Sequence, residues 1–399
     1  QDWSSSTTTI AANWSGFFDA TSGIAFYEYA IGSSPGSVDI WSWDSVGTET
    51  NFSKDDLDLE NGVTYYTSIR ATDYAGNLST AVGSDGITVD LMDPVIVSLF
   101  EGSTSEDLDY QQNNSQLIVV WSGSDATASR VITSYHVCLG ISPGDSNIVD
   151  WIELDNVTDY TFINLNLVDA VTYYASVRAK DQAGNLSDIF TGDGITIDRS
   201  TPFPGQVNDG TEGDIDWVTI NYLGEGNWTG FFDSLSGIAE YEYSLGLNPN
   251  QTQAVSWTSS GLDTTITVSA SLTEGPTYFA NVRAIDSVGN ISPNVSSDGF
   301  GLDQSSPAAG TVIDGLENDQ VWTSGIESLS ASWSGFSDQY SGIEFYEYAI
   351  GTSIGGQGLV NWTIVDMATA VTHQDLNLND GTTYYSSVRA TDLVENVSE

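Results

Sequence analysis

One block of about 106 residues occurs four times in this chain of 399 residues. Each copy contains a stretch with a central arginine, and successive arginines are separated by 108, 105 and 106 residues. The four stretches are TYYTSIRATDYAGNLS (64–79), TYYASVRAKDQAGNLS (172–187), TYFANVRAIDSVGNIS (277–292) and TYYSSVRATDLVENVS (383–398). A solenoid repeats every ~20–50 residues, whereas a repeat of this length is one domain. We therefore expect four domains, bounded near Pro94, Pro202 and Pro307, at 1–93, 94–201, 202–306 and 307–399.

A second recurring block predicts that each domain is all-β. It reads WSGFFDATSGIAFYEYAIG (14–32), WSGSDATASRVITSYHVCLG (121–140), WTGFFDSLSGIAEYEYSLG (228–246) and WSGFSDQYSGIEFYEYAIG (333–351). Apolar and polar residues alternate with a period of two, which is typical of strands with one buried face. Turn sequences such as SPGS, NDG, AGN and SDG separate these strands. Short strands in units of about 100 residues favour a β-sandwich. In the third unit, glycines in NYLGEGNW leave the register of one strand in doubt.

The net charge of the chain disfavours two classes of binding partner. It has 8 Lys plus Arg against 55 Asp plus Glu, a formal net charge of −47. Nucleic acids and anionic membrane surfaces attract cationic proteins, so neither is an expected partner. No apolar run reaches the ~18 residues of a membrane helix, so we expect no membrane insertion in this segment. The single cysteine, Cys138, rules out an intrachain disulfide and is expected to be buried.

Together these motifs resemble the fibronectin type III module, an immunoglobulin-like β-sandwich, over essentially the whole chain. The tandem, acidic and cysteine-poor form resembles extracellular surface or filament proteins of prokaryotes. The resemblance implies that the first Trp of each second block is the core Trp of the second strand, and that a Tyr begins each arginine stretch as a tyrosine corner, whose hydroxyl bonds to nearby backbone. These residues are Trp14, Trp121, Trp228 and Trp333, and Tyr65, Tyr173, Tyr278 and Tyr384.

In that fold the strand with the arginine neighbours the strand that contains YEYAIG. We expect cross-strand pairs that stabilise each domain: Arg70 with Glu28, Arg283 with Glu242, and Arg389 with Glu347. A later Trp in each domain could stack on the guanidinium: Trp43, Trp257 and Trp362. The second domain has His136 in place of the Glu, so Arg178 needs another partner, with Asp181 and Trp151 as candidates. The alternative is that the four arginines form a ligand-binding row.

Catalysis is not expected. The two histidines, His136 and His373, lie in different domains, and no nucleophile motif, phosphate loop or Cys/His metal cluster occurs. Carboxylates are so frequent that their proximity in sequence carries no weight.

Calcium is the best cofactor hypothesis. Three aspartates end a domain directly before a linker, and the next domain begins with an acidic turn. Because Ca²⁺ takes six to eight oxygen ligands, carboxylates from both sides of a junction could bind it and stiffen the hinge. The predicted ligands are Asp90, Asp198, Asp303, Glu101, Asp209 and Asp314. The alternative is that these acids make Asx turns or only solvate the surface.

The turn D-x-x-G-N after each arginine strand is a further candidate ligand set, although a turn with Asn or Gly at positive φ explains it more simply. The same turns contain N-x-S sequons, which we expect to be exposed and thus the first glycosylation candidates: Asn77, Asn185, Asn290 and Asn396.

The sequence therefore predicts a non-catalytic extracellular or cell-surface protein, part of an adhesin or filament. Its expected partners are other copies of itself, other surface proteins or glycans. Alternatives are a carbohydrate-binding stalk of a larger secreted enzyme and a calcium-dependent surface-layer component. Surplus tryptophans could give sugar-stacking platforms, namely Trp41, Trp43, Trp151, Trp217, Trp257, Trp322 and Trp362. The first domain lacks a lead-in strand and the fourth lacks its last strand, so we expect a segment of a longer array; strand exchange between subunits is the alternative.

Overall fold

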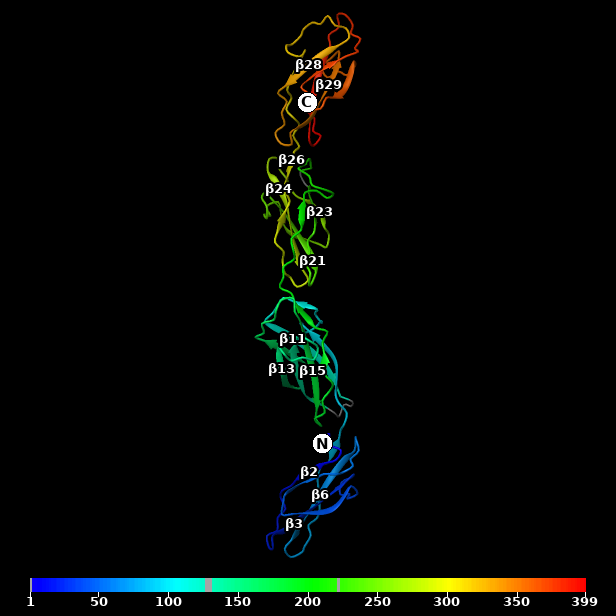
Figure 1. The fold of residues 1–399 in the computed structure, drawn as a ribbon, viewed down its shortest axis with the longest axis vertical. Helices are drawn as coiled ribbons and strands as arrows, with labels where there is room; N and C mark the ends of the chain where they lie inside the picture. Colours follow the sequence, from blue (N-terminus) through cyan, green and yellow to red (C-terminus); the bar gives the residue numbers. More distant parts are fainter. Residues whose placement is uncertain (1, 126–130, 221–222) are drawn as a thin grey trace. The chain divides into compact units, whose positions relative to one another are not determined.

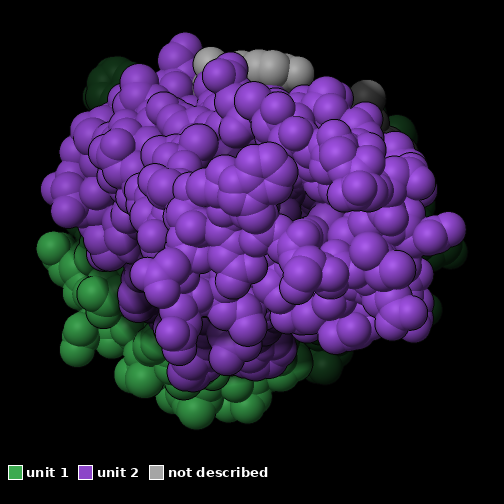
Figure 2. Space-filling view, turned by 90° about the horizontal axis from the view of Figure 1, so that it is seen from above, with its two compact units in different colours: residues 1–199 green, residues 200–399 purple. Residues whose placement is uncertain are grey.

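The computed structural model describes residues 2–125, 131–220 and 223–399 (Figure 1). These residues form strands and turns and no helix. The strand ladders all lie inside one of the four ranges expected from the repeat, which we call repeats 1 to 4. Each repeat also has its own cluster of buried apolar side chains between its two sheets. The chain divides into two compact units, residues 1–199 and 200–399 (Figure 2), each with two repeats.

Repeat 1 consists of a six-stranded sheet, in the order β1-β8-β6-β3-β4 with β7 beside β6, and a two-stranded sheet of β2 and β5. β1 is parallel to β8, and the other pairs are antiparallel. The strands are β1 (Asp2–Ser4), β2 (Ile10–Asn13), β3 (Ile24–Gly32), β4 (Trp41–Gly47), β5 (Asn51–Lys54), β6 (Thr64–Asp73), β7 (Val82–Gly83) and β8 (Ile87–Val89).

Repeat 2 repeats this larger sheet as β10-β17-β15-β12-β13 with β16 beside β15, and its second sheet has three strands in the order β14-β11-β9. The strands are β9 (Val95–Glu101), β10 (Tyr110–Gln111), β11 (Gln116–Ser124), β12 (Ile132–Gly140), β13 (Val149–Asp155), β14 (Asp159–Ile163), β15 (Thr172–Asp181), β16 (Phe190–Thr191) and β17 (Ile195–Ile197). Residues 126–130 of the second block lie outside the described residues.

Repeat 3 has the same two sheets, β19-β26-β24-β21-β22 with β25 beside β24, and β18-β20-β23. The strands are β18 (Gln206–Asn208), β19 (Trp217–Val218), β20 (Leu223–Thr229), β21 (Ile238–Gly246), β22 (Val255–Gly261), β23 (Thr265–Ser269), β24 (Thr277–Asp286), β25 (Val295–Ser296) and β26 (Phe300–Leu302). The glycine-rich strand keeps a regular register, with Gly224 opposite Val268 and Gly226 opposite Ile266. A Cβ on Gly224 would lie 3.0 Å from Leu245, which explains why glycine suits that position. Asn221 and Tyr222, at the start of NYLGEGNW, are not among the described residues.

Repeat 4 has two three-stranded sheets, β30-β29-β32 and β27-β28-β31. The strands are β27 (Thr311–Asp314), β28 (Leu329–Ser334), β29 (Ile343–Gly351), β30 (Val360–Ile364), β31 (Ala370–His373) and β32 (Tyr385–Asp392). The four repeats therefore share one arrangement: the strand with YEYAIG or its equivalent pairs with the arginine strand in one sheet, and the strand that contains or directly precedes the core Trp lies in the other.

Candidate functional site: arginine strands and acidic clusters

The arginine strands carry cross-strand ion pairs in three repeats. The register places each arginine directly opposite the expected glutamate, and the guanidinium bonds to the carboxylate at 2.6–2.8 Å. The pairs are Arg70–Glu28, Arg283–Glu242 and Arg389–Glu347. Their side chains are between 13% and 33% exposed, so they are shielded but not dry. The pairing expected from the sequence is thus present, at an expected contribution of about 0.2–1 kcal/mol each.

A tryptophan two strands away in the same sheet lies over each guanidinium. The distances from the guanidinium carbon to the ring centroid are 4.1, 4.9, 4.4 and 4.4 Å for Arg70–Trp43, Arg178–Trp151, Arg283–Trp257 and Arg389–Trp362. Cations at such distances from an aromatic face are attracted by the ring quadrupole. Four tryptophans considered as sugar platforms therefore already contact an arginine. A structural role for the four arginines, rather than a ligand-binding row, remains a prediction.

Repeat 2 departs from this arrangement. His136 lies opposite Arg178, and its Nε2 is 3.9 Å from Glu153. Burial and the charge of Arg178 lower the pKa of His136 below its ordinary value. Arg178 keeps only its contact with Trp151 of the two candidate partners, because Asp181 belongs to a cluster of carboxylates. Its Nε is buried and has no hydrogen-bond partner among the described residues.

The D-x-x-G-N sequence of repeats 1 to 3, and the corresponding D-x-x-E-N of repeat 4, form one kind of turn. The aspartate Oδ1 accepts the backbone N–H of the residue four positions later, at 2.7–2.8 Å, and Oδ2 accepts the side-chain amide of that Asn. The positive φ falls on Gly76, Gly184 and Gly289, and on Glu395 in repeat 4, so the asparagine itself does not need it. The simpler interpretation of this motif, as a turn, agrees with the structure.

The four sequon asparagines are not equally exposed. Asn77 is exposed, but Asn290 is only 5% exposed, so the expectation of an exposed turn is wrong there. Asn185 and Asn396 are partly buried, and their amides donate to the linker carbonyls of Asp90 and Ser305. In repeats 2 and 4 this turn therefore packs on the linker that precedes the repeat. Glycosylation of the four residues remains a prediction, for which Asn77 is the most accessible.

Two clusters of three aspartates lie at repeat junctions, one in each unit. Asp90, Asp125 and Asp181 form one, and Asp303, Asp338 and Asp392 form the other. Within each cluster, one carboxylate oxygen of every residue lies within 4.8 Å of the other two. The three sequence positions are the same in both: the last residue before the linker, the aspartate of the second block, and the aspartate of the turn. Asp198, Asp233 and Asp286 occupy these positions where the two units adjoin in sequence.

Glu101 and Asp209 belong to a second kind of cluster, so the expectation that they share a junction site with Asp90 and Asp198 is wrong. Glu101 groups with Asp107 and Asp193, and Asp209 with Asp214 and Asp298. The reason is geometric: β9 is seven residues long, and at ~3.3 Å per residue it carries Glu101 away from the linker. Asp314 likewise ends β27, where its Oδ1 accepts the hydroxyl of Ser386.

Glu101 connects the two sheets of repeat 2. It is fully buried, and its two carboxylate oxygens accept the N–H groups of Ala175 at 2.6 Å and Gly194 at 2.8 Å. Burial raises the pKa of Glu101 to about 7, and the charges of Asp107 and Asp193 add to this. In repeat 3, burial raises the pKa of Asp209 to about 6, and its Oδ2 accepts the N–H of Gly299.

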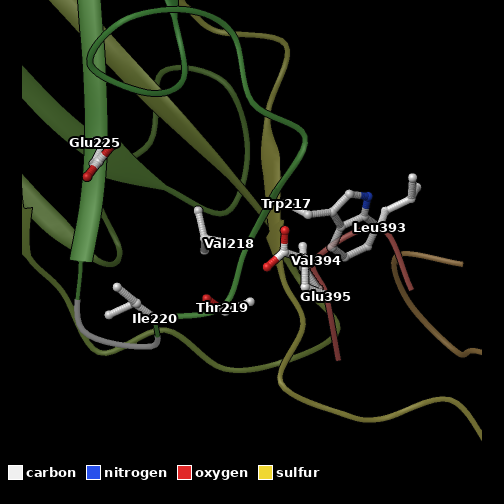
Figure 3. A pocket seen from close by; sticks show the side chains of 8 residues that line it. All are labelled: Trp217, Val218, Thr219, Ile220, Glu225, Leu393, Val394 and Glu395. Carbon is white, nitrogen blue, oxygen red and sulfur yellow. The ribbon is translucent and has the colours of Figure 1, made fainter. Parts of the chain in front are cut away.

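A shallow groove of about 380 Å³ lies between repeats 3 and 4 in the second unit (Figure 3). Trp217 and Glu225 line it from repeat 3, and Leu393, Val394 and Glu395 from repeat 4. Of the other tryptophans considered as platforms, Trp41 is covered by Lys54 at 3.7 Å, whereas Trp322 is 89% exposed.

The expected tyrosine corner occurs in every repeat. Each tyrosine hydroxyl accepts the backbone N–H of the residue five positions earlier, at 2.8–2.9 Å. The pairs are Tyr65 with Glu60, Tyr173 with Val168, Tyr278 with Thr273, and Tyr384 with Asn379. The core tryptophans Trp14, Trp121, Trp228 and Trp333 pack edge-on against a tyrosine of the next strand at 5.5–5.9 Å. Each repeat is a fibronectin type III-like β-sandwich.

Comparisons with known proteins find partial similarity to two glucanases and to one solved structure. No family model matches the chain. Exoglucanase B of Cellulomonas fimi is 25% identical to it over 290 residues, and Endoglucanase B of the same species is 28% identical over 299 residues. These alignments cover 70% and 71% of this chain but 24% and 25% of the glucanases. The fibronectin type III-like array thus spans about a quarter of the length of the curated relatives it matches.

A solved structure of the FN1–FN3 domains of chicken CNTN1 also aligns with the array. It covers 73% of this chain and 93% of its own, at 17% identity and a TM-score of 0.29. Within the part of the chain that is described, there is no helix of the length and apolarity needed to cross a membrane.

Proposed function

We propose that this chain is a non-catalytic spacer and binding region of a secreted protein. The observation that carries the proposal is the use of its recurring polar motifs. Three of the four arginines pair with a glutamate of the same repeat, and all four contact a tryptophan. The tyrosine hydroxyls bond to backbone amides, and an aspartate of each repeat forms the turn after the arginine strand. Residues that recur in every repeat therefore serve the sandwich itself, which is what a string of structural modules requires.

The groups that could support catalysis are also committed elsewhere. His136 faces Arg178, and Nδ1 of His373 lies 2.6 Å from the hydroxyl of Tyr348. Of the described carboxylates with a raised pKa, Glu101 and Asp209 are fully buried, and the exposed Asp107 accepts the backbone N–H of Glu101. A glycoside hydrolase needs two carboxyl groups that flank a substrate in a cleft. Buried carboxyl groups that accept backbone N–H bonds do not meet that requirement.

Within this proposal, the similarity to two glucanases favours a stalk of a secreted enzyme over an adhesin. The relatives are named exoglucanase and endoglucanase, and the aligned region is about a quarter of each. We infer that the shared region is the part that spaces other domains. In this chain it consists of repeated sandwiches, and its described residues form no pair of carboxyl groups in a cleft. An extracellular location follows from this inference.

The test is direct. The purified chain should release no soluble sugar from carboxymethyl cellulose or insoluble cellulose, measured as reducing ends over many hours, with an intact glucanase as the positive control. Hydrolysis by this chain, lost on substitution of one of its own carboxylates, would refute the proposal.

An adhesive role is the second candidate, and one surface feature favours it. The loop before β28 exposes a set of large apolar side chains: Leu316, Val321, Trp322 and Ile326 are 54%, 80%, 89% and 61% exposed. Exposed apolar sets of this kind mark contact sites. Glycans, other surface proteins and further copies of this chain are the proposed partners, in an adhesin, a filament or a calcium-dependent surface layer. Trp322→Ala should abolish retention on cellulose or a glycan array, whereas Trp362→Ala, which removes a tryptophan over Arg389, should preserve it. Equal binding by wild type and Trp322→Ala would exclude this surface.

A further inference from the structure

The junction cluster of the second unit brings together three elements. Asp303 follows β26 at the end of repeat 3, Asp338 lies in the turn between β28 and β29, and Asp392 ends β32. Asp303 and Asp392 are fully buried, and Asp338 is partly buried. One oxygen of each carboxylate lies within 4.8 Å of the other two. Like charges at that separation repel where water is excluded, and a cation between them would offset this repulsion.

Each of the three carboxylates accepts two backbone N–H groups. Asp303 accepts the N–H groups of Ser305 and Ser341, each at 3.0 Å. Asp338 Oδ1 accepts two backbone N–H groups at 2.9 Å, and Asp392 accepts those of Val394 and Asn396. These bonds fix the orientation of the three carboxylates.

A second observation points to a missing ligand. Oδ2 of Asp338 is inaccessible to solvent and accepts no hydrogen bond from the described residues. The hydroxyl oxygen of Ser341, a residue that is 6% exposed, is likewise buried without a partner, and the backbone N–H of this residue donates to Asp303. Buried polar atoms are nearly always satisfied, so two such atoms in one turn, beside three carboxylates, require an ion or water. Among the described residues, no Lys or Arg forms an ion pair with these aspartates.

Repeat 1 gives an internal comparison. Asp19 occupies the position of Asp338, and its Oδ1 accepts the N–H groups of Thr21 and Gly23 as Asp338 accepts those of Tyr340 and Gly342. Asp73 there forms the same turn as Asp392. Both turns thus form without a third aspartate. The linker aspartate is not needed for the turns, yet it recurs as Asp90, Asp198 and Asp303.

We propose that Asp303, Asp338 and Asp392 bind a hard divalent cation of the calcium class, and that Asp90, Asp125 and Asp181 form the equivalent site in the first unit. Carboxylate oxygens supply part of the ligand set that Ca²⁺ takes, and three of them balance its charge with an excess of one negative charge. Because Asp303 belongs to the linker and the other two residues to repeat 4, the cation would fix the linker on the repeat that follows it. This inference goes beyond the spacer proposal and does not depend on it.

The experiment compares two matched variants in the full chain, Asp338→Asn and Asp19→Asn. Asparagine keeps an oxygen that can accept the backbone N–H bonds, so both turns should still form. Protein freed of metal with EDTA and dialysed is titrated with CaCl₂ by calorimetry, and melting is followed with CaCl₂ or EDTA. We expect wild type and Asp19→Asn to bind the same number of ions and to melt at higher temperature with calcium. Asp338→Asn should bind one ion fewer.

Melting in EDTA separates the alternatives. Without the cation, Asp338→Asn removes one of three repelling charges, so repeat 4 should melt no lower than in wild type. Two results would overturn the proposal: an equal number of bound ions in wild type and Asp338→Asn, or a loss of stability in Asp338→Asn that is the same with calcium and with EDTA. The second result would make Asp338 only a turn residue. Asp303→Asn, which changes the linker ligand and keeps Asp338 and Asp392, provides a second variant with the same expected loss of one ion.

Discussion

Replacing His136 with glutamate should stabilise repeat 2. In the other three repeats a glutamate at this position bonds to the arginine of the next strand at 2.6–2.8 Å. In repeat 2 the arginine is Arg178, whose buried Nε has no hydrogen-bond partner among the described residues. A cross-strand ion pair contributes about 0.2–1 kcal/mol, and an unsatisfied buried donor costs about 1–3 kcal/mol. Allowing for the partial exposure of such pairs, we expect His136→Glu to raise the free energy of unfolding of repeat 2 by about 1–2 kcal/mol.

The only cysteine of the chain makes this repeat measurable by itself. Cys138 lies on the same strand as His136 and is fully buried, and burial raises the pKa of its thiol to about 11. A thiol reagent therefore reacts only when repeat 2 opens, whatever the other repeats do. An increase of 1–2 kcal/mol corresponds to roughly 5- to 30-fold slower labelling in mild denaturant. Labelling of the denatured variants corrects for any change in intrinsic thiol reactivity.

The stability of repeat 2 should also depend on pH through His136. Because the folded pKa of His136 is lowered, the unfolded chain binds the proton more readily, and folded repeat 2 loses stability as the pH falls through the ordinary histidine pKa of about 6.5. Glu101, with a pKa raised to about 7, contributes in the opposite direction. The difference between wild type and His136→Gln isolates the histidine, and it should change in favour of the variant as the pH falls. Labelling of His136→Glu at the wild-type rate, or a difference that does not vary with pH, would refute the reasoning.

Two further variants test the remaining contacts. Arg389→Ala removes the ion pair with Glu347 and the contact with Trp362, so calorimetry should show repeat 4 destabilised by about 1 kcal/mol. Retention on cellulose or on a glycan array should stay unchanged. If retention is lost while the melting temperature is unchanged, the arginine would instead be assigned to a ligand site. Glu101→Gln removes a carboxyl group that binds its proton more tightly in the folded state. Wild-type repeat 2, followed through Cys138, should therefore gain stability from this group between about pH 7 and pH 5, and the variant should lose that gain.

The strands could be predicted from the sequence because their signals are local. A period of two places Glu28 and Arg70 on the same outward face, and the fold then makes their strands neighbours. The tyrosine corner is equally local, since Tyr65 reaches a backbone N–H only five residues away. Each of these features recurs in all or most repeats, so a departure such as His136 stands out when the four repeats are aligned with one another.

The carboxylate clusters could be predicted only in part, because they depend on which loops meet. The sequence marks Asp303 at the end of a repeat but does not show that Asp338 and Asp392 lie beside it. Both residues do recur in every repeat, and this recurrence is the signal that could have found them. For Glu101 the local sequence is misleading, because an acid before a glycine is typical of an exposed turn. In the structure this carboxylate is buried and accepts the backbone N–H groups of Ala175 and Gly194.

The distribution of positive charge connects the strands with the junctions. The chain has eight Lys and Arg residues and fifty-five Asp and Glu residues. Four of the eight cations are the arginines that stack on tryptophans within a sheet. Lys54 covers Trp41, and Lys180 lies 4.0 Å from Glu153. Six of the eight cations thus stabilise the sheets or their edges. A chain that uses its scarce cations there has few left for the buried aspartates between repeats, and a metal ion supplied by the medium can balance that charge without an additional basic residue.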